Sequence, residues 1–302
     1  MTMMPTWKQE KLTMIKPKRY TITILCMLAF LSQSVTVLAD NKRSIVASTK
    51  PLAIIAKSAV ADAATVEYLI PANQSPHDFA LPMSALQKIA KADVVIWIGN
   101  DFETSSAKIM TKVAKTKLIT ALELADYPLL QSHSNAQHDE SDHHMTRDPH
   151  VWLSPQNGNQ IAFEIQRRLD LPVREIITQQ QINKLSSEIA MARSSSYISH
   201  HDAYGHFVEA FALKSGLSIR DARGGAQGLK TQYQLRKTIT EANVRCILVE
   251  PHYGTKDVDL IAEEFNLPMI DFDTQGLSQR ISDTAYLEFI SALVTQFKIC
   301  AQ

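Results

Sequence analysis

Histidine is concentrated in one part of this sequence, where it lies beside carboxylates. Five of the ten histidines fall within the 18 residues from His133 to His150, in the segments HSNAQHDESDHH and DPHVWLSP. Imidazole and carboxylate groups together are typical ligands of zinc and of other divalent transition metals. These residue types therefore point first to metal binding.

The histidines of this part are of two kinds. The run over residues 131–146 is polar and of low complexity, which is typical of a segment without fixed structure. His150 instead stands between a proline and an apolar turn, so we expect it to be an ordered ligand. The four upstream histidines are expected to be auxiliary, low-affinity metal ligands, with a solvated loop as the alternative. They are His133, His138, His143 and His144.

Three histidines from distant segments occupy similar positions. His77 follows a predicted strand in a proline-bounded loop, His150 precedes a predicted helix, and His201 ends a predicted strand in HHDAY. In parallel α/β sheets, ligand groups gather at the carboxyl ends of strands, and loops from two lobes can face one cleft. We therefore expect these three side chains to converge on one metal ion.

Other residues could complete or replace members of this set. Asp273 follows a predicted strand in the same way and could add a carboxylate. His200 and His206 flank His201, and the spacing does not decide which of the three points inward. His252 also follows a strand, with a surface position as the alternative.

Short β-branched runs alternate with segments of helical periodicity, which predicts two α/β lobes with parallel sheets. In the first lobe, residues 40–172, strands are expected at 44–48, 65–70, 93–98 and 117–122. In the second, residues 194–302, they are expected near 196–199, 246–249 and 268–272, before a closing helix at 284–297. Residues 173–193 contain no glycine or proline, which predicts one long, rigid connecting helix of about 30 Å. The metal site would lie in the cleft between the lobes.

The N-terminus has the pattern of a secretory signal. Residues 1–20 are basic, residues 21–31 are apolar, and Val37-Leu38-Ala39 offers a cleavage site. A transmembrane anchor is the alternative, but the apolar stretch is short for a span. We expect residues 1–39 to be removed and the protein to be periplasmic.

Charge and cysteine content fit this expectation. The whole chain has a formal net charge of zero, which argues against nucleic acid as a partner. Removal of residues 1–39 leaves 26 basic and 30 acidic residues, a net charge of −4 that suits a cationic ligand. Cys246 and Cys300 then remain as a pair, which predicts a disulfide in an exported protein. Two buried thiols are the alternative.

Three segments together resemble the signature motifs of a known family. SPHDFALPMS, DPHVWLSP and HHDAYGHF are similar, in this order, to the segments of ABC-importer solute-binding proteins that capture zinc or manganese, and most of all to the zinc-uptake (ZnuA) type. The resemblance covers residues 44–300. It implies two α/β lobes joined by a rigid helix, no enzymatic activity, and an inner-membrane permease with its ATPase as partners of a monomer.

The resemblance also implies site residues. His77, His150 and His201 match the three histidine ligands of the family. Asp273, in DFDTQG, falls where the family commonly has an aspartate, with Asp271 as the alternative. Cys246 and Cys300 resemble the disulfide of some zinc members.

Zinc is the expected ion, because three imidazoles with a carboxylate or water favour tetrahedral Zn²⁺, whereas manganese prefers more oxygen ligands. Affinity is expected to fall below about pH 6, as imidazoles protonate. A manganese-binding protein of the same family is one alternative. A zinc hydrolase with Glu250 as base is another, against which the chain has no HExxH motif and no nucleophile elbow.

Overall fold

The computed structural model describes residues 42–77, 79–124 and 148–302, and Lys42–Gln302 form one compact unit. The predicted signal at residues 1–39 and the histidine-rich run at 131–146 lie outside the described residues. Within the described part, no helix is long and apolar enough to cross a membrane.

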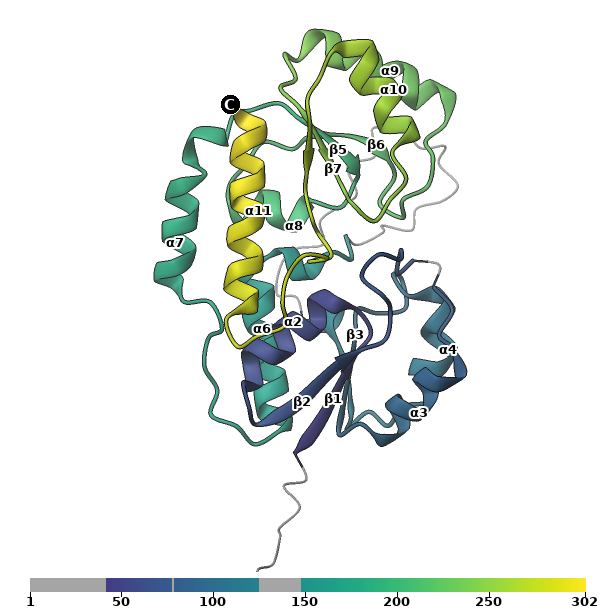
Figure 1. Ribbon diagram of the computed structural model, residues 1–302, viewed down its shortest axis with the longest axis vertical. Coiled ribbons are helices and arrows are strands. Elements are labelled where there is room, and N and C mark those ends of the chain that lie inside the picture. The colour runs from purple at the N-terminus through teal and green to yellow at the C-terminus, as the bar shows by residue number, and fades with distance from the viewer. Residues whose placement is uncertain (1–41, 78, 125–147) are drawn as a thin grey trace, which may run out of the picture. The chain divides into compact units, whose positions relative to one another are not determined.

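The first lobe, the N-lobe, is built on a four-stranded parallel sheet in the order β2-β1-β3-β4 (Figure 1). β3 is buried along its whole length, as expected of a central parallel strand with both faces covered. The strands are β1 (Arg43–Ala47), β2 (Ala64–Tyr68), β3 (Val94–Trp97) and β4 (Leu118–Thr120). The helices are α2 (Lys50–Val60), α3 (Met83–Lys91), α4 (Ala107–Met110), α5 (Ala121–Leu124) and α6 (Pro155–Arg168).

The second lobe, the C-lobe, repeats this plan with the strand order β6-β5-β7-β8, again all parallel. Strand β6 and the short helix α8 were not predicted from the sequence. The strands are β5 (Ile198–His201), β6 (Leu217–Arg220), β7 (Ile247–Val249) and β8 (Met269–Asp271). The helices are α8 (Gly205–Ala210), α9 (Leu229–Glu241), α10 (Lys256–Phe265) and α11 (Ala285–Ala301). The predicted α/β fold with two parallel sheets is confirmed.

The predicted connecting helix over residues 173–193 is wrong in extent. Helix α7 covers only Gln179–Glu188, and a 3-10 turn follows at Ala190–Ala192. The helix starts late because Thr178 and Gln181 form a capping box at its N-terminus. Before it, side chains of α6 hold the chain in a non-helical conformation: Gln166 accepts from the backbone N–H of Arg174 (2.9 Å), and Asn159 accepts from those of Ile176 and Ile177 (3.0 and 3.2 Å).

The C-terminal helix α11 ties the lobes together instead. It runs beside α7 and reaches down to α2 and α6 of the N-lobe (Figure 1). The hydroxyl of Tyr286, in its first turn, donates to the carbonyls of Trp152 and Ser154 at 3.0 and 2.8 Å. Gly158 of α6 leaves room for this ring, since a Cβ there would lie 2.2 Å from it.

The other end of α11 is fixed by the predicted disulfide. Cys300 is bonded to Cys246, which directly precedes β7, and the two Cα atoms are 5.4 Å apart. Both cysteines are buried against the core.

Reduction of this disulfide should destabilise the protein strongly. The bond closes a loop across a separation of 54 residues, for which the chain-entropy model gives about 4 kcal/mol. We expect the free energies of unfolding, measured in urea with and without reductant, to differ by about that amount. The Cys246→Ala/Cys300→Ala variant should be as stable as the reduced protein. Equal stability of oxidised and reduced protein would show that the bond constrains nothing.

Candidate metal centre

The structure brings together three of the predicted ligands. His77, His150 and His201 each offer a ring nitrogen, and these nitrogens lie within 4.8 Å of one another. All three residues are buried, with exposed fractions of 7%, 1% and 2%. His77 comes from the loop after β2, His150 from the turn before α6, and His201 from the end of β5. The group therefore draws on both lobes, as predicted.

The turn around His150 explains the segment DPHVWLSP. The carboxylate of Asp148 accepts from the backbone N–H of His150 at 3.0 Å and from its Nδ1 at 2.7 Å. After it, Val151–Leu153 form a buried 3-10 turn, and Ser154 caps α6 with Pro155 in its first turn. The indole of Trp152 donates to the carbonyl of Thr274 at 2.9 Å, which fixes the turn to the C-lobe. His150 thus has one orientation before any ion arrives.

His201 is oriented by a second carboxylate, that of Glu250, which follows β7. Its Oε1 accepts from Nδ1 of His201 and from the hydroxyl of Tyr204 (3.2 Å), and its Oε2 accepts from Thr274 (2.5 Å). Burial alone would raise the pKa of Glu250, but the attraction of His201 and His252 and the hydrogen bonds from His201 and Thr274 lower it to about 2. The carboxylate is therefore ionised at neutral pH and can only accept hydrogen bonds.

His77 is held by packing. Its ring lies 4.4 Å from that of Phe102, centroid to centroid, and Phe102 also contacts His150 and Trp152. Burial, together with the nearby imidazoles of His150 and His201, lowers the pKa of His77 to about 3. Burial likewise lowers the pKa of His150, against the opposing effect of Asp148. These two imidazoles are thus neutral, the state in which they bind metals.

The decisive feature is how the rings of His150 and His201 face each other. Their Nε2 atoms are 3.2 Å apart, while each Nδ1 is bound to a carboxylate. Because the carboxylates of Asp148 and Glu250 can only accept hydrogen bonds, each Nδ1 carries a proton, and Nε2 is the ring nitrogen that each histidine has left to bind an ion. Two ligands at about 2.05 Å from a tetrahedral zinc ion would be about 3.3 Å apart. The spacing therefore fits two ligands of one metal ion.

Asp273 does not join this group. Its two carboxylate oxygens accept from the backbone N–H groups of Leu277 and Ser278 (2.8 and 3.0 Å) and from the Ser278 hydroxyl. It thus closes the turn before α11 and is not part of the three-histidine group. The alternative, Asp271, is exposed at the end of β8.

The remaining described histidines surround the group without entering it. His206 contacts the carbonyl of Asp148 through Nε2 at 3.0 Å and so supports the turn of His150. His200 accepts from the backbone N–H of Glu250 at 3.4 Å. Nε2 of His252 lies 3.7 Å from Glu250 and its Nδ1 has no hydrogen-bond partner among the described residues, so the surface position considered for it is wrong. His133, His138, His143 and His144 lie outside the described residues.

Sequence reasoning missed the residues that orient the ligands. Asp148 stands two residues before His150 in the same motif. A carboxylate so close to a predicted ligand could have indicated that it orients the imidazole. Glu250 follows a predicted strand as the ligands do, but the sequence suggested it only as the base of a hydrolase. Phe102 gave no signal, because its role arises from packing, and Tyr204 gave none, because its hydrogen bond to Glu250 joins distant segments.

Loss of the Glu250 charge should weaken metal binding while the ligands remain. A carboxylate behind a ligating histidine fixes its tautomer and makes it more basic, and removal of such a partner typically costs 10- to 100-fold in metal affinity. We expect Glu250→Gln to lower zinc affinity by roughly that factor in a competition titration with a chromophoric chelator. Glu241→Gln, on the exposed end of α9, is the matched control and should bind zinc normally. Unchanged affinity in Glu250→Gln would contradict this role.

Comparison with known proteins agrees with this geometry. The family described as zinc-uptake complex component A, periplasmic (ZnuA), matches residues 45–172 and 175–300. The chain belongs to this family. The ZnuA family is a transport family, so the chain is not an enzyme and the hydrolase alternative falls.

Relatives within the ZnuA family have names that refer to zinc. The high-affinity zinc uptake system protein ZnuA of Haemophilus ducreyi is 26% identical, over 93% of this chain and 98% of its own length. That of Yersinia pestis is 28% identical, over 85% and 91%. The zinc-binding lipoprotein AdcA of Streptococcus pneumoniae is 30% identical over 84% of this chain but only 59% of AdcA.

Solved structures share the fold. A crystal structure of ZnuA superposes with a TM-score of 0.68 at 20% identity, over 86% of this chain and 98% of the other. The periplasmic zinc-binding protein TroA of Treponema pallidum gives a TM-score of 0.68 at 16% identity, over 86% and 99%. At these identities the likeness supports the two-lobed fold and no more.

Proposed function

We propose that this protein captures Zn²⁺ in the periplasm between its two lobes and delivers the ion to an ABC-type importer of the inner membrane. His77, His150 and His201 bind the ion through neutral imidazoles. The observation that carries the proposal is the convergence of the Nε2 atoms of His150 and His201 at 3.2 Å, each backed by a carboxylate. Family membership and the names of the relatives support zinc as the ion.

The donor set also favours zinc over manganese. Three buried imidazoles with no carboxylate in the described group suit tetrahedral zinc, whereas manganese prefers oxygen. We propose water for the fourth position, because both oxygens of Asp273 already accept hydrogen bonds. Capture breaks no covalent bond, because the ion only exchanges coordinated water for imidazole nitrogen.

Calorimetric titration of the metal-stripped protein tests this function. We expect one tight zinc site per chain, with manganese bound at least about 100-fold more weakly. Absence of a tight zinc site, or tighter binding of manganese, would overturn the proposal. Export is proposed from residues 1–39, and detection of the processed chain in a periplasmic extract would test it.

The histidine-rich run is proposed as an auxiliary store of weakly bound zinc. Deletion of residues 131–145 should leave the tight site unchanged, since its three ligands lie outside that range, and should remove weaker zinc binding. Equilibrium dialysis across a range of zinc concentrations measures both. Loss of the tight site on deletion would mean that the run supplies one of its ligands.

A further inference from the structure

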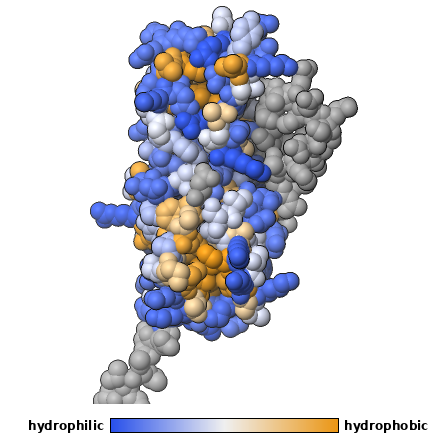
Figure 2. Space-filling model, turned by 90° about the vertical axis from the view of Figure 1, so that its right-hand side faces the viewer, coloured by the Kyte–Doolittle hydropathy of each residue, from blue (hydrophilic) through white to orange (hydrophobic). Residues whose placement is uncertain are grey.

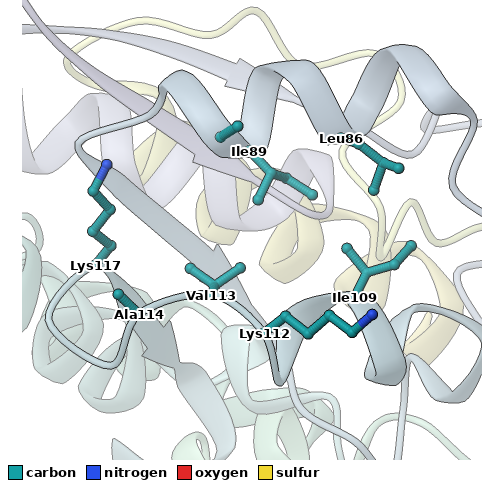
Figure 3. Close-up of a pocket in the computed structure, with 8 residues that line it drawn as sticks. Leu86, Ile89, Ile109, Lys112, Val113, Ala114 and Lys117 are labelled. Carbon is teal, nitrogen blue, oxygen red and sulfur yellow. The ribbon is translucent and has the colours of Figure 1, made fainter.

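A groove on the N-lobe, none of whose lining residues belongs to the three-histidine group, has the features of an interaction surface. It lies between α3 and the segment from α4 to β4, and its cavity volume is about 450 Å³. The side chains that line it are mainly apolar, with a lysine on either side (Figure 3). They include Leu86, Ile89, Ile109 and Val113, together with Lys112 and Lys117. Figure 2 shows apolar side chains gathered on this lobe and surrounded by hydrophilic ones.

The floor of the groove is continuous with the interior. Ile89 belongs to a buried apolar cluster with Trp97 and Met110, and the half-buried Ile109 and Val113 pack against it. Helix α4, beside the groove, is only four residues long and ends at Met110. A cavity of this volume with apolar walls is large enough for an organic ligand or part of one.

Lysine is concentrated in the two segments that form this groove, and Lys112 and Lys117 line the groove itself. Residues 107–118 carry four lysines and no acidic residue, and α3 adds two more. Among the described residues, Glu67 pairs with Lys88 at 2.6 Å, and the Nζ of Lys117 donates to the carbonyl of Ala92 at 2.9 Å. No ion pair within the described part of the chain involves the other four lysines, which are exposed. These four are Lys91, Lys108, Lys112 and Lys115.

The kind of positive charge indicates the kind of partner. Residues 83–120 contain no arginine, the side chain best suited to bidentate recognition of a single carboxylate on a protein. Lysine ammonium groups are flexible point charges, and clusters of four to eight of them attract a surface of many anionic lipids. Apolar side chains beside such a cluster can add contact with acyl chains, as the apolar face of an interfacial amphipathic helix does.

We propose that this lysine-rimmed groove docks the N-lobe on an anionic phospholipid bilayer, with the lysines on the headgroups and acyl chain in the groove. The contact is peripheral and reversible. It would hold the protein at the membrane independently of any metal, so it does not rest on the zinc site.

Vesicle sedimentation with the chain from residue 40 onward tests the proposal. Residues 1–39 must be absent, because their apolar segment would bind bilayers by itself. We expect binding to vesicles of 70% phosphatidylcholine and 30% phosphatidylglycerol, no binding to pure phosphatidylcholine, and loss of binding at about 0.5 M salt, where charges are screened. Equal binding to both vesicles, or binding to neither, would overturn the proposal.

Two variants separate the contributions of charge and groove. Lys108→Gln/Lys112→Gln/Lys115→Gln should weaken binding to the anionic vesicles at least tenfold, and Val113→Asn should weaken it with all lysines present. The matched control, Lys184→Gln/Lys230→Gln/Lys237→Gln on α7 and α9, removes the same charge elsewhere and should bind as before. Normal zinc affinity in each variant shows that it is folded.

Three outcomes would contradict the assignment. Equal loss in the control and in the N-lobe triple variant would mean that total charge, and not this surface, attracts lipid. Full binding by Val113→Asn would remove the groove from the contact. Binding of an acidic amphipathic peptide to the groove without any binding to vesicles would identify a protein segment as the partner.

Discussion

Replacement of His150 by alanine should abolish tight zinc binding. His150 is 1% exposed, and its Nε2 lies 3.2 Å from that of His201, where the proposed ion would bind. Loss of an outer partner of a ligand costs up to about 100-fold, so loss of the ligand itself should cost more than about 100-fold in affinity. Titration of the metal-stripped variant in competition with a chelator of known affinity measures the change.

His200→Gln is the matched control for this variant. His200 is fully buried beside His201, yet its ring contacts the backbone N–H of Glu250 and does not belong to the three-histidine group. We expect it to lose much less affinity than His150→Ala. If His150→Ala kept a tight site, or if His200→Gln lost as much, the ligand set would be misassigned.

Acid should destabilise the metal-free protein between pH 6.5 and 4.5, where carboxylates with ordinary pKa values are still ionised. Burial lowers the pKa of His77 to about 3 and that of His200 to about 4, and it also lowers the pKa values of His150 and His252. The unfolded chain binds protons near pH 6.5, where the folded chain does not. The contribution of these four histidines to the free energy of unfolding is therefore complete above pH 6.5 and is lost as the pH falls toward 3. His77 alone would contribute on the order of 5 kcal/mol over that range.

One buried carboxyl group acts in the opposite direction. Burial raises the pKa of Glu103 to about 7, against hydrogen bonds from Ser48 and Ile98. Its folded form holds a proton that the unfolded form releases, so its contribution is complete below pH 4.5 and is lost as the pH rises through 7. Between pH 7 and 4.5, protonation of Glu103 partly offsets the loss of stability that the histidines cause.

Urea unfolding of metal-stripped protein at pH 7.0 and 4.5 measures the net effect. We expect a lower free energy of unfolding at pH 4.5, a smaller difference in His77→Asn, and a larger one in Glu103→Gln. Because the low pKa values keep protons from competing with zinc, affinity should also persist below the pH of about 6 expected for ordinary imidazoles. A free energy of unfolding that rises at pH 4.5 would show that the imidazoles are not buried in neutral form.

The sequence predicted which histidines converge better than it predicted the elements that position them. Histidines at strand ends can be recognised from periodicity, and His77, His150 and His201 do converge. The helix predicted at 173–193 is too long, because the side chains of Asn159 and Gln166 bind backbone N–H groups between residues 174 and 177. Such long-range partners leave no local pattern in the sequence. The same limit applies to Asp273. It follows a strand as predicted, but its oxygens accept hydrogen bonds from the backbone N–H groups of Leu277 and Ser278.

An anomalous-scattering map of crystals grown with zinc tests the central claim most directly. We expect one strong peak between His77, His150 and His201, within about 2.1 Å of Nε2 of His150 and of His201, and no peak at Asp273. A tight zinc peak on other residues, or an Nε2 pair of His150 and His201 without metal, would contradict the account.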